Sequence, residues 1–493
     1  MVENIARADT KKNALEKSKL YESLDVLNEV EWKSLGKWLD SPWCNSNKKL
    51  CDFYQLLNKN RHRKNKFDKE SIFKKLYPGK KYNNKIFNNL MREFVLQVER
   101  FLAAIDLLSD TVRFKDQLGQ SYLLRKKLNL FNEISRSAIQ LIEEKATKEW
   151  EDYLQLGIVH EKLYFQPDQD IRYQPNPDNL IGAEKNLDLF YALGKFRILH
   201  EYAARKELLK YELKNEPEFK HLTFLKNELN HPAINLYFLK LSRNKNWGAD
   251  EFIQFKESML QNFSALPFRE KKVFLLSAIN DTVVLVSKGH TGFLNDMFEL
   301  YKKGIEAELL IHEGFMTVTT FNNIVLVANN LLETAFVKGF ISKYIDCLPE
   351  ETKLEARLWS ESQTLYSSGY SEKVIDHIGQ YNFRHALYGV LSRGTLLKAN
   401  YDVTLKDPSR KNLFLSYCDS FEQYMRRGHL FVPDRNEAYI RLAQYTKKLM
   451  NIALHKKGDK EEKLKKLKAR LEKEKNIFGK LWLLRKIDEL KSI

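Results

Sequence analysis

The chain has 493 residues, a formal net charge of +17, and 43% hydrophobic and 12% aromatic residues. Such a composition is typical of a folded globular protein and excludes an intrinsically disordered chain. Only 19 glycines and 11 prolines are present, which favours long helices over a turn-rich β fold. No apolar run approaches the roughly 18 residues of a membrane-spanning helix. We therefore expect an all-α protein without a membrane span.

Apolar residues recur at helical spacing in the N-terminal part of the chain. Ser41-Pro42 ends the first helical pattern, because the residue before a proline is disfavoured in the α-helical region. A second helix is expected from Lys48 to Asn58. The residues expected to form the apolar faces are Leu24, Leu27, Trp32, Leu35, Trp38, Leu39, Leu50, Phe53, Tyr54 and Leu57.

A short helix and then a long helix are predicted to follow. Asp68 is expected to cap the short helix, which Tyr77-Pro78-Gly79 ends. The long helix is expected to begin at Asn83 or Asn84 and to continue to about Leu108, because its apolar residues follow one helical face. The buried residues of the two helices are expected to be Ile72, Phe73, Leu76, Ile86, Phe87, Leu90, Phe94, Val98, Phe101, Leu102 and Ile105.

Positive charge is concentrated in the same region. Residues 48–85 contain thirteen Lys or Arg and three acidic residues, so the stretch has a net charge of +10. A local field of that sign attracts polyanions, including nucleic acid, anionic membrane surfaces and acidic proteins. A basic surface that is simply solvated is the competing interpretation.

The short helix, the Pro-Gly turn and the long helix are similar to the helix-turn-helix half of a winged-helix domain. Asn and Arg side chains suit base edges, and Lys suits phosphates. No β-hairpin signal follows Leu108 to serve as the wing, so an ordinary solvated helix pair stays open as an alternative. The candidate polyanion-binding or nucleic-acid-binding residues are Arg61, Arg63, Lys64, Lys80, Lys81, Lys85, Asn88, Asn89 and Arg92.

Beyond Ser109 the chain predicts a succession of helices. Long helices are expected at about 114–144, 148–164 and 180–213. Three prolines in residues 166–179 forbid a helix there and indicate a long loop. From Pro217 onward, helical patterns alternate with short turns, which is typical of antiparallel helix pairs.

Part of this region has the period of a helical repeat. Helices expected to start near Thr317, Glu351 and Phe383 are 34 and 32 residues apart, and the tetratricopeptide period is about 34 residues. The full tetratricopeptide consensus is met nowhere in the chain. The spacing therefore predicts a degenerate helix-pair solenoid.

The C-terminal segment predicts two further helices. Residues 456–475 contain ten Lys or Arg and five acidic residues, with one thin stripe formed by Leu464, Leu467 and Leu471. A wider apolar face begins at Ile477. We expect that face to be buried, either as the cap of the solenoid or against a partner chain.

These patterns divide the chain into four expected segments. They are a flexible polar tail (1–19), a basic N-terminal helical module (20–110), a tetratricopeptide-like solenoid (111–455), and a charged helix followed by a capping helix (456–493).

Short stretches spread along the chain resemble a family of uncharacterised bacterial proteins built of tetratricopeptide-like helices. The stretches are residues 39–43 (Leu-Asp-Ser-Pro-Trp), 73–79 (Phe-Lys-Lys-Leu-Tyr-Pro-Gly), 186–191, 195–197 and 421–427. The resemblance implies a helical-repeat fold, and it implies no catalytic or binding residue.

No catalytic constellation is expected. The chain contains no glycine-rich phosphate loop and no His-Glu-x-x-His motif, and its eleven histidines are scattered singly. Cys44, Cys51, Cys347 and Cys418 have no metal-ligand spacing, so we expect neither a metal nor another cofactor. Few cysteines and the lack of an apolar stretch in residues 1–19 predict a cytoplasmic protein.

The function expected from these observations is that of a non-enzymatic scaffold, whose helical-repeat surface binds a protein or a peptide. The alternative is a regulatory protein that binds nucleic acid through the basic N-terminal module. The sequence names neither the partner nor the oligomeric state.

Overall fold

The protein is all-helical, as the sequence predicts. The computed structural model describes residues 18–60, 69–166, 177–209, 219–242, 247–427, 433–455, 460–474 and 476–491. These residues form 23 α-helices and two short 3-10 helices, and no strand is found among them. Nor is any helix of these ranges both long and apolar enough to cross a membrane.

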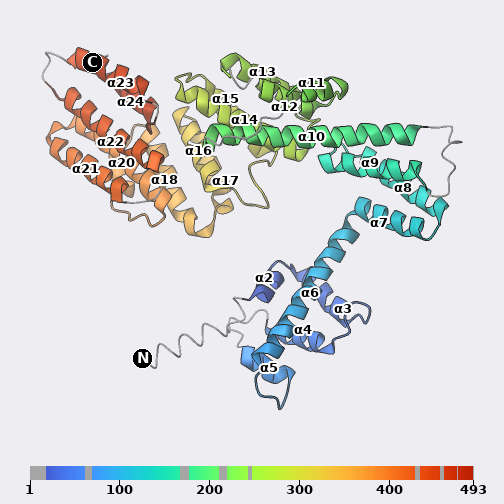
Figure 1. The fold of residues 1–493 in the computed structure, drawn as a ribbon. Coiled ribbons are helices and arrows are strands. Elements are labelled where there is room, and N and C mark those ends of the chain that lie inside the picture. Colours follow the sequence, from blue (N-terminus) through green and yellow to red (C-terminus); the bar gives the residue numbers. More distant parts are fainter. Residues whose placement is uncertain are drawn as a thin grey trace. The chain divides into compact units, whose positions relative to one another are not determined.

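The chain divides into two compact units (Figure 1). Unit 1 consists of Met1–Lys145 and Leu154–Asn186, and unit 2 of Ala146–Tyr153 and Leu187–Ile493. Helices α9 and α10 each contribute residues to both units. The helices that begin in unit 1 or at its boundary are α2 (Lys19–Asp25), α3 (Glu29–Asp40), α4 (Lys48–Asn60), α5 (Lys69–Leu76), α6 (Asn84–Ser109), α7 (Thr111–Leu124), α8 (Leu128–Glu143), α9 (Trp150–Tyr164) and α10 (Asp178–Leu209).

Helix α6 organises the N-terminal part of unit 1. Helices α2, α3 and α4 pack against it, and α5 packs against α4 (Figure 1). Aromatic rings join these helices: Phe53 of α4 lies 5.3 Å from Phe94 and 5.6 Å from Phe87, measured between ring centroids. Phe53, Phe87 and Phe94 are each fully buried. The apolar residues predicted for α4 and α5 all belong to this core.

The predicted start of α6 is confirmed, and one of its predicted core residues is wrong. The side chain of Asn83 caps the helix by accepting hydrogen bonds from the backbone N–H groups of Lys85 and Ile86, at 3.0 and 3.1 Å. Ile86 itself is 40% exposed. It lies in the first turn of α6, just before Phe87, the first buried residue of the helix.

The single helix expected at 114–144 is in fact two helices. Helix α7 ends at Leu124, α8 begins at Leu128, and the two pack against each other. Lys126 reverses the chain with φ of +57°, a left-handed conformation that costs about 1–2 kcal/mol for a residue other than glycine. Packing of α7 on α8 offsets this cost, and no Gly or Pro marks the turn in the sequence.

Unit 2 contains the remaining helices. They are α11 (Phe219–Glu228), α12 (Pro232–Ser242), α13 (Ala249–Gln261), α14 (Phe268–Ser287), α15 (Phe293–Glu306), α16 (Val318–Asn330), α17 (Thr334–Tyr344), α18 (Glu350–Ser367), α19 (Ser371–Ile378), α20 (Ala386–Lys406), α21 (Lys411–Arg427), α22 (Pro433–Ala453), α23 (Lys460–Lys473) and α24 (Lys480–Lys491). The 3-10 helices Ile345–Cys347 and Pro408–Arg410 precede α18 and α21. Neighbouring helices in this order pack on one another from α11 to α16.

Alternate helices also make contact in the second half of unit 2. Helix α16 packs on α18, α18 on α20, and α20 on α22. The helix starts expected near Thr317, Glu351 and Phe383 correspond to α16, α18 and α20, which begin at Val318, Glu350 and Ala386. Helix α20 is the most deeply embedded of the three, and its residues belong to three of the hydrophobic cores of the unit.

The C-terminal helices complete the second of these cores. Leu464, Leu467 and Leu471 of α23 are buried, as are Leu483 and Ile487 of α24. Helix α24 packs on α22 and α23. The apolar face that the sequence left without a partner is therefore covered within the chain.

Candidate functional sites

The described residues of the expected polyanion-binding set lie around the start of α6. Lys80 and Lys81 are exposed in the turn that precedes this helix. Lys85, Asn89 and Arg92 are exposed on α6, where spacings of four and three residues place them on one face of the helix. The structure therefore brings these five side chains to one end of the N-terminal module.

Asn88 differs from these five residues, and three members of the set are not described. Asn88 is half-buried, so it offers less of its amide than Asn89 does. Arg61, Arg63 and Lys64 lie outside the described residues, as does Asp68, the expected cap of α5.

The basic side chains near α6 have few acidic neighbours. Lys49 and Lys74 pair with Asp52 and Glu70, at 3.2 and 2.9 Å. Lys80 instead lies over the ring of Tyr77, with 5.8 Å between its Nζ and the ring centroid. Among the described residues no ion pair joins an acidic group to Lys81, Lys85 or Arg92. These three residues are called the unpaired basic face. Because these charges are not neutralised locally, they can attract an anionic ligand.

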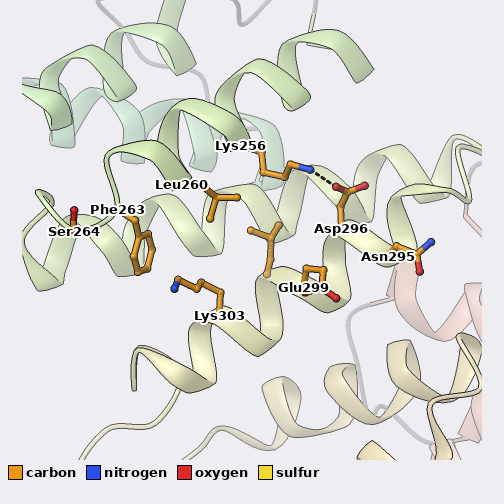
Figure 2. A pocket seen from close by; sticks show the side chains of 9 residues that line it. Lys256, Leu260, Phe263, Ser264, Asn295, Asp296, Glu299 and Lys303 are labelled. Carbon is orange, nitrogen blue, oxygen red and sulfur yellow. Dashed lines mark hydrogen bonds and ion pairs between the residues drawn. The ribbon is translucent and has the colours of Figure 1, made fainter.

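A second candidate site is a groove between α13 and α15 in unit 2 (Figure 2). It has a volume of about 710 Å³ and an opening to solvent. Helix α14, which lies between α13 and α15 in the chain, packs on both. The residues that line the groove are Lys256, Leu260, Phe263, Ser264, Asn295, Asp296, Glu299, Leu300 and Lys303.

Charged groups border the apolar surface of this groove. Lys256 of α13 forms an ion pair with Asp296 of α15, which joins the two helices (Figure 2). Lys303 lies over the ring of Phe263, with 5.2 Å between its Nζ and the ring centroid. Lys271 of α14 approaches the same ring at 5.7 Å. Two positive groups therefore lie near the ring of Phe263, beside the apolar surface that it forms with Leu260 and Leu300.

A cluster of polar groups is buried elsewhere in unit 2. Glu270 of α14 is 2% exposed and Tyr237 of α12 is fully buried. Burial, and then the neighbouring carboxylate of Glu149, raises the pKa of Glu270 to about 7, although Arg197 and Arg269 oppose the shift. One carboxylate oxygen of Glu270 and the hydroxyl of Tyr237 have no hydrogen-bond partner among the described residues. Shifted acids of this kind occur at functional sites, but these two groups are closed off from solvent.

Lys398 of α20 is the most perturbed lysine in the described part of the chain. Burial lowers its pKa to about 8, although nearby Asp402 opposes the shift. Its Nζ lies 6.0 Å from the ring centroid of Phe478 and 5.7 Å from that of Trp482. The C-terminal segment supplies both rings, so Lys398 contributes to the attachment of that segment to α20.

No metal centre is found among the described residues, since no three His, Cys, Asp or Glu side chains are grouped to hold an ion. No family model, no curated protein and no solved structure matches the chain. The candidate sites are therefore defined by their own geometry.

The sequence interpretation missed the groove and one exposed aromatic residue. The lining residues of the groove come from α13, from the turn that follows it and from α15. They form no motif, so no local signal marks them. Trp43 is 94% exposed. Its position in the polar stretch Ser41-Pro42-Trp43-Cys44-Asn45 is a signal that could have identified it, because a tryptophan in such a turn has no helical face on which to be buried.

Proposed function

We propose that the protein is a non-enzymatic scaffold and that the groove between α13 and α15 binds a segment of a partner protein. The groove is the observation that carries the proposal. Its volume of about 710 Å³ lies within the range of about 300–1,000 Å³ that is usual for ligand pockets. The groove combines an apolar surface with charged groups at its border, which is the chemistry of a peptide-binding site.

The packing of unit 2 supports a repeat architecture for the scaffold. Contacts between α16 and α18, α18 and α20, and α20 and α22 are those of a stack in which alternate helices form one layer. We propose that this stack is a degenerate tetratricopeptide-like solenoid, in line with the expected family resemblance. Such stacks present extended surfaces to partner proteins.

The charge of the groove suggests the chemistry of the bound segment. The positive groups of Lys271 and Lys303 lie beside Phe263, and Lys303 also forms a long ion pair of 3.9 Å with Glu306. Lys256 and Asp296 neutralise each other, and the lining residue Glu299 pairs with Lys302. A segment with an apolar side chain next to a carboxylate fits this arrangement. The apolar side chain packs on Leu260, Phe263 and Leu300, and the carboxylate meets the two lysines.

Photo-crosslinking in living cells tests this function. The photoreactive amino acid benzoylphenylalanine is introduced in place of Leu260 in the groove. In a control protein it replaces Leu354, which is 59% exposed on α18 and does not line the groove. We expect a discrete crosslinked partner from position 260 alone, and its loss when Phe263→Glu is added. Identical products from both positions, or none from position 260, contradict the proposal.

The unpaired basic face favours a second function, binding of nucleic acid. Lys81, Lys85 and Arg92 are exposed and lie together at the start of α6, beside Lys80 and Asn89. Phosphates attract such lysines, and release of counterions makes the binding strongly dependent on salt. Asn89 and Arg92 also carry the groups that contact base edges.

A binding titration with a labelled oligonucleotide tests this second function. The triple variant Lys80→Glu, Lys81→Glu and Lys85→Glu is expected to lose binding and most of its salt dependence. A control variant with the same change of net charge replaces the exposed lysines Lys288, Lys338 and Lys406 of unit 2 and is expected to bind normally. Equal losses in both triple variants indicate an effect of net charge alone and contradict the proposal.

A further inference from the structure

Trp43 differs from every other tryptophan of the chain. Its side chain is 94% exposed, whereas Trp32 and Trp359 are buried and the remaining four are half-buried. Burying an aromatic side chain is strongly favourable. An indole that the fold leaves in water is therefore available to a ligand.

The turn that carries Trp43 is rigid. The N–H of Cys44 donates to the carbonyl oxygen of Ser41 at 3.0 Å, which closes a turn with Pro42 and Trp43 at its centre. Proline at this position fixes its own φ. Asn45 is 8% exposed, and its amide donates to the carbonyl oxygens of Leu39 and Asn47 at 2.9 and 3.1 Å. Little conformational entropy is lost when a ligand contacts the indole of such a turn.

The segment after this turn contacts α6 one residue beyond Arg92 of the unpaired basic face. The side-chain amide of Asn47 donates a hydrogen bond of 2.8 Å to Glu93, the residue that follows Arg92 on α6. Lys48, which begins α4 directly after Asn47, is exposed. Lys49 then approaches the ring of Tyr77 at 5.7 Å, and Lys80 reaches the same ring at 5.8 Å. Basic side chains thus continue from the Trp43 turn to the start of α6.

We propose that Trp43 and the unpaired basic face form a binding site for single-stranded nucleic acid, with an unpaired base stacked on the indole. The proposal rests on the second function above and specifies its ligand. Proteins that bind single strands combine a basic surface, which follows the phosphates, with aromatic side chains on which bases stack. The bases of a duplex already stack on each other, so a duplex gains nothing from Trp43.

Charge complementarity and the polar character of the surface favour this ligand over a membrane. The surface also carries polar groups, since Asn47 donates to Glu93 and Asn89 is exposed on α6 between Lys85 and Arg92. These groups hydrogen-bond readily to bases and sugars. A membrane-binding surface instead requires a continuous apolar face that enters the lipid, and a single indole among amides and a carboxylate does not provide one.

Binding titrations with the full-length chain test the proposal. The ligands are a labelled oligothymidylate of about 16 nucleotides and a duplex of equal length, at about 50 mM salt. We expect Trp43→Ala to weaken binding of the single strand by about 5- to 150-fold, the effect of losing one stacked base. Binding of the duplex is expected to stay unchanged. The matched control is Val30→Ala, since Val30 is 73% exposed in the same module and is expected to have no effect.

Intrinsic fluorescence provides a second readout. Addition of oligothymidylate is expected to quench the emission of the wild-type chain, and Trp43→Phe should abolish most of that quenching, because the other tryptophans are buried or half-buried. Equal weakening of single strand and duplex by Trp43→Ala overturns the stacking proposal while the nucleic-acid function stands. Failure of the wild-type chain to bind either oligonucleotide overturns both. Binding to phosphatidylserine vesicles that Trp43→Ala abolishes, without effect on oligothymidylate, assigns the surface to lipid and overturns the proposal.

Discussion

The side-chain amide of Asn47 donates a hydrogen bond of 2.8 Å to the carboxylate of Glu93, and this bond joins the segment after α3 to α6. The turn itself is held by Asn45, whose side-chain carbonyl oxygen accepts from the N–H of Asn47 at 2.9 Å. Two asparagines therefore connect the exposed Trp43 to the helix on which the N-terminal module is assembled.

Asn45→Ala is expected to lower the free energy of unfolding of the N-terminal module by about 1–3 kcal/mol, because buried backbone groups lose their partners. Hydrogen exchange of the α3–α4 connection, followed by mass spectrometry, measures the change locally. Ser46→Ala is the control, since Ser46 is exposed and adjacent. Equal exchange rates in the two variants would show that Asn45 does not hold the turn.

Two glycines of unit 2 are expected to respond oppositely to the same substitution. A Cβ on Gly304 of α15 would lie 2.6 Å from Leu275 and 2.8 Å from Leu310, and both leucines are buried. Gly304→Ala should therefore destabilise the protein by about 1–3 kcal/mol. A Cβ on Gly339 of α17 meets open space, so Gly339→Ala should stabilise it by up to about 1 kcal/mol. Thermal unfolding distinguishes the two signs, and a gain in stability from Gly304→Ala would refute the packing described for α14 and α15.

The ion pair between Lys240 and Asp281 links α12 to α14. The two charged groups are 2.5 Å apart, and their side chains are 12% and 13% exposed. Asp281→Asn is expected to cost about 3–5 kcal/mol, because it removes the carboxylate that faces the largely buried Lys240. Glu70→Gln breaks the exposed pair with Lys74 and should cost no more than about 0.5 kcal/mol. Urea unfolding of both variants measures these costs, and similar values for the two would contradict the assigned burial.

The stability of unit 2 is expected to depend on pH through Glu270. Its pKa is raised from 4.5 to about 7, so between these pH values the folded state binds more protons than the unfolded state. The free energy of unfolding should therefore fall as the pH rises through this range. His200 and His231, whose pKa values desolvation lowers from 6.5 to about 4, produce the opposite trend.

Comparison with Glu270→Gln separates the contribution of the Glu270 carboxyl to the pH dependence from that of the two histidines. The free energy of unfolding of the wild-type chain, relative to that of the variant, should fall by up to about 1.4 kcal/mol per pH unit between pH 4.5 and about 7. Urea unfolding at several pH values measures this difference. A difference that is independent of pH would show that Glu270 is ionised throughout in the folded protein.

Local sequence patterns predict much of the helical framework. The Asn83 cap, the break at Ser41-Pro42 and the starts of α16, α18 and α20 follow from residue preferences that act within a few positions. The turn at Lys126 could not be predicted, because a non-glycine residue adopts positive φ there only as a result of the packing of α7 on α8. Ile86 was misplaced because the apolar pattern of α6 does not show where the core ends.

The candidate sites were less accessible to prediction than the helices. Lys80, Lys81, Lys85, Asn89 and Arg92 could be identified because charge is visible in the sequence, and the structure places them on one exposed surface. The groove depends on residues from α13 and α15 that α14 brings together. Its pairing of Lys256 with Asp296 is a tertiary contact, which the sequence of either helix alone does not contain.

Selection from a random peptide library, displayed against the purified full-length chain, tests the scaffold function most directly. Enriched peptides are expected to share an acidic residue next to apolar residues. Their affinity should fall by about 30-fold or more in Phe263→Glu, whereas Leu354→Glu on α18 should leave it unchanged. Peptides that lack this pattern, or that bind both variants as tightly as the wild-type chain, would contradict the assignment of the α13–α15 groove as the binding site.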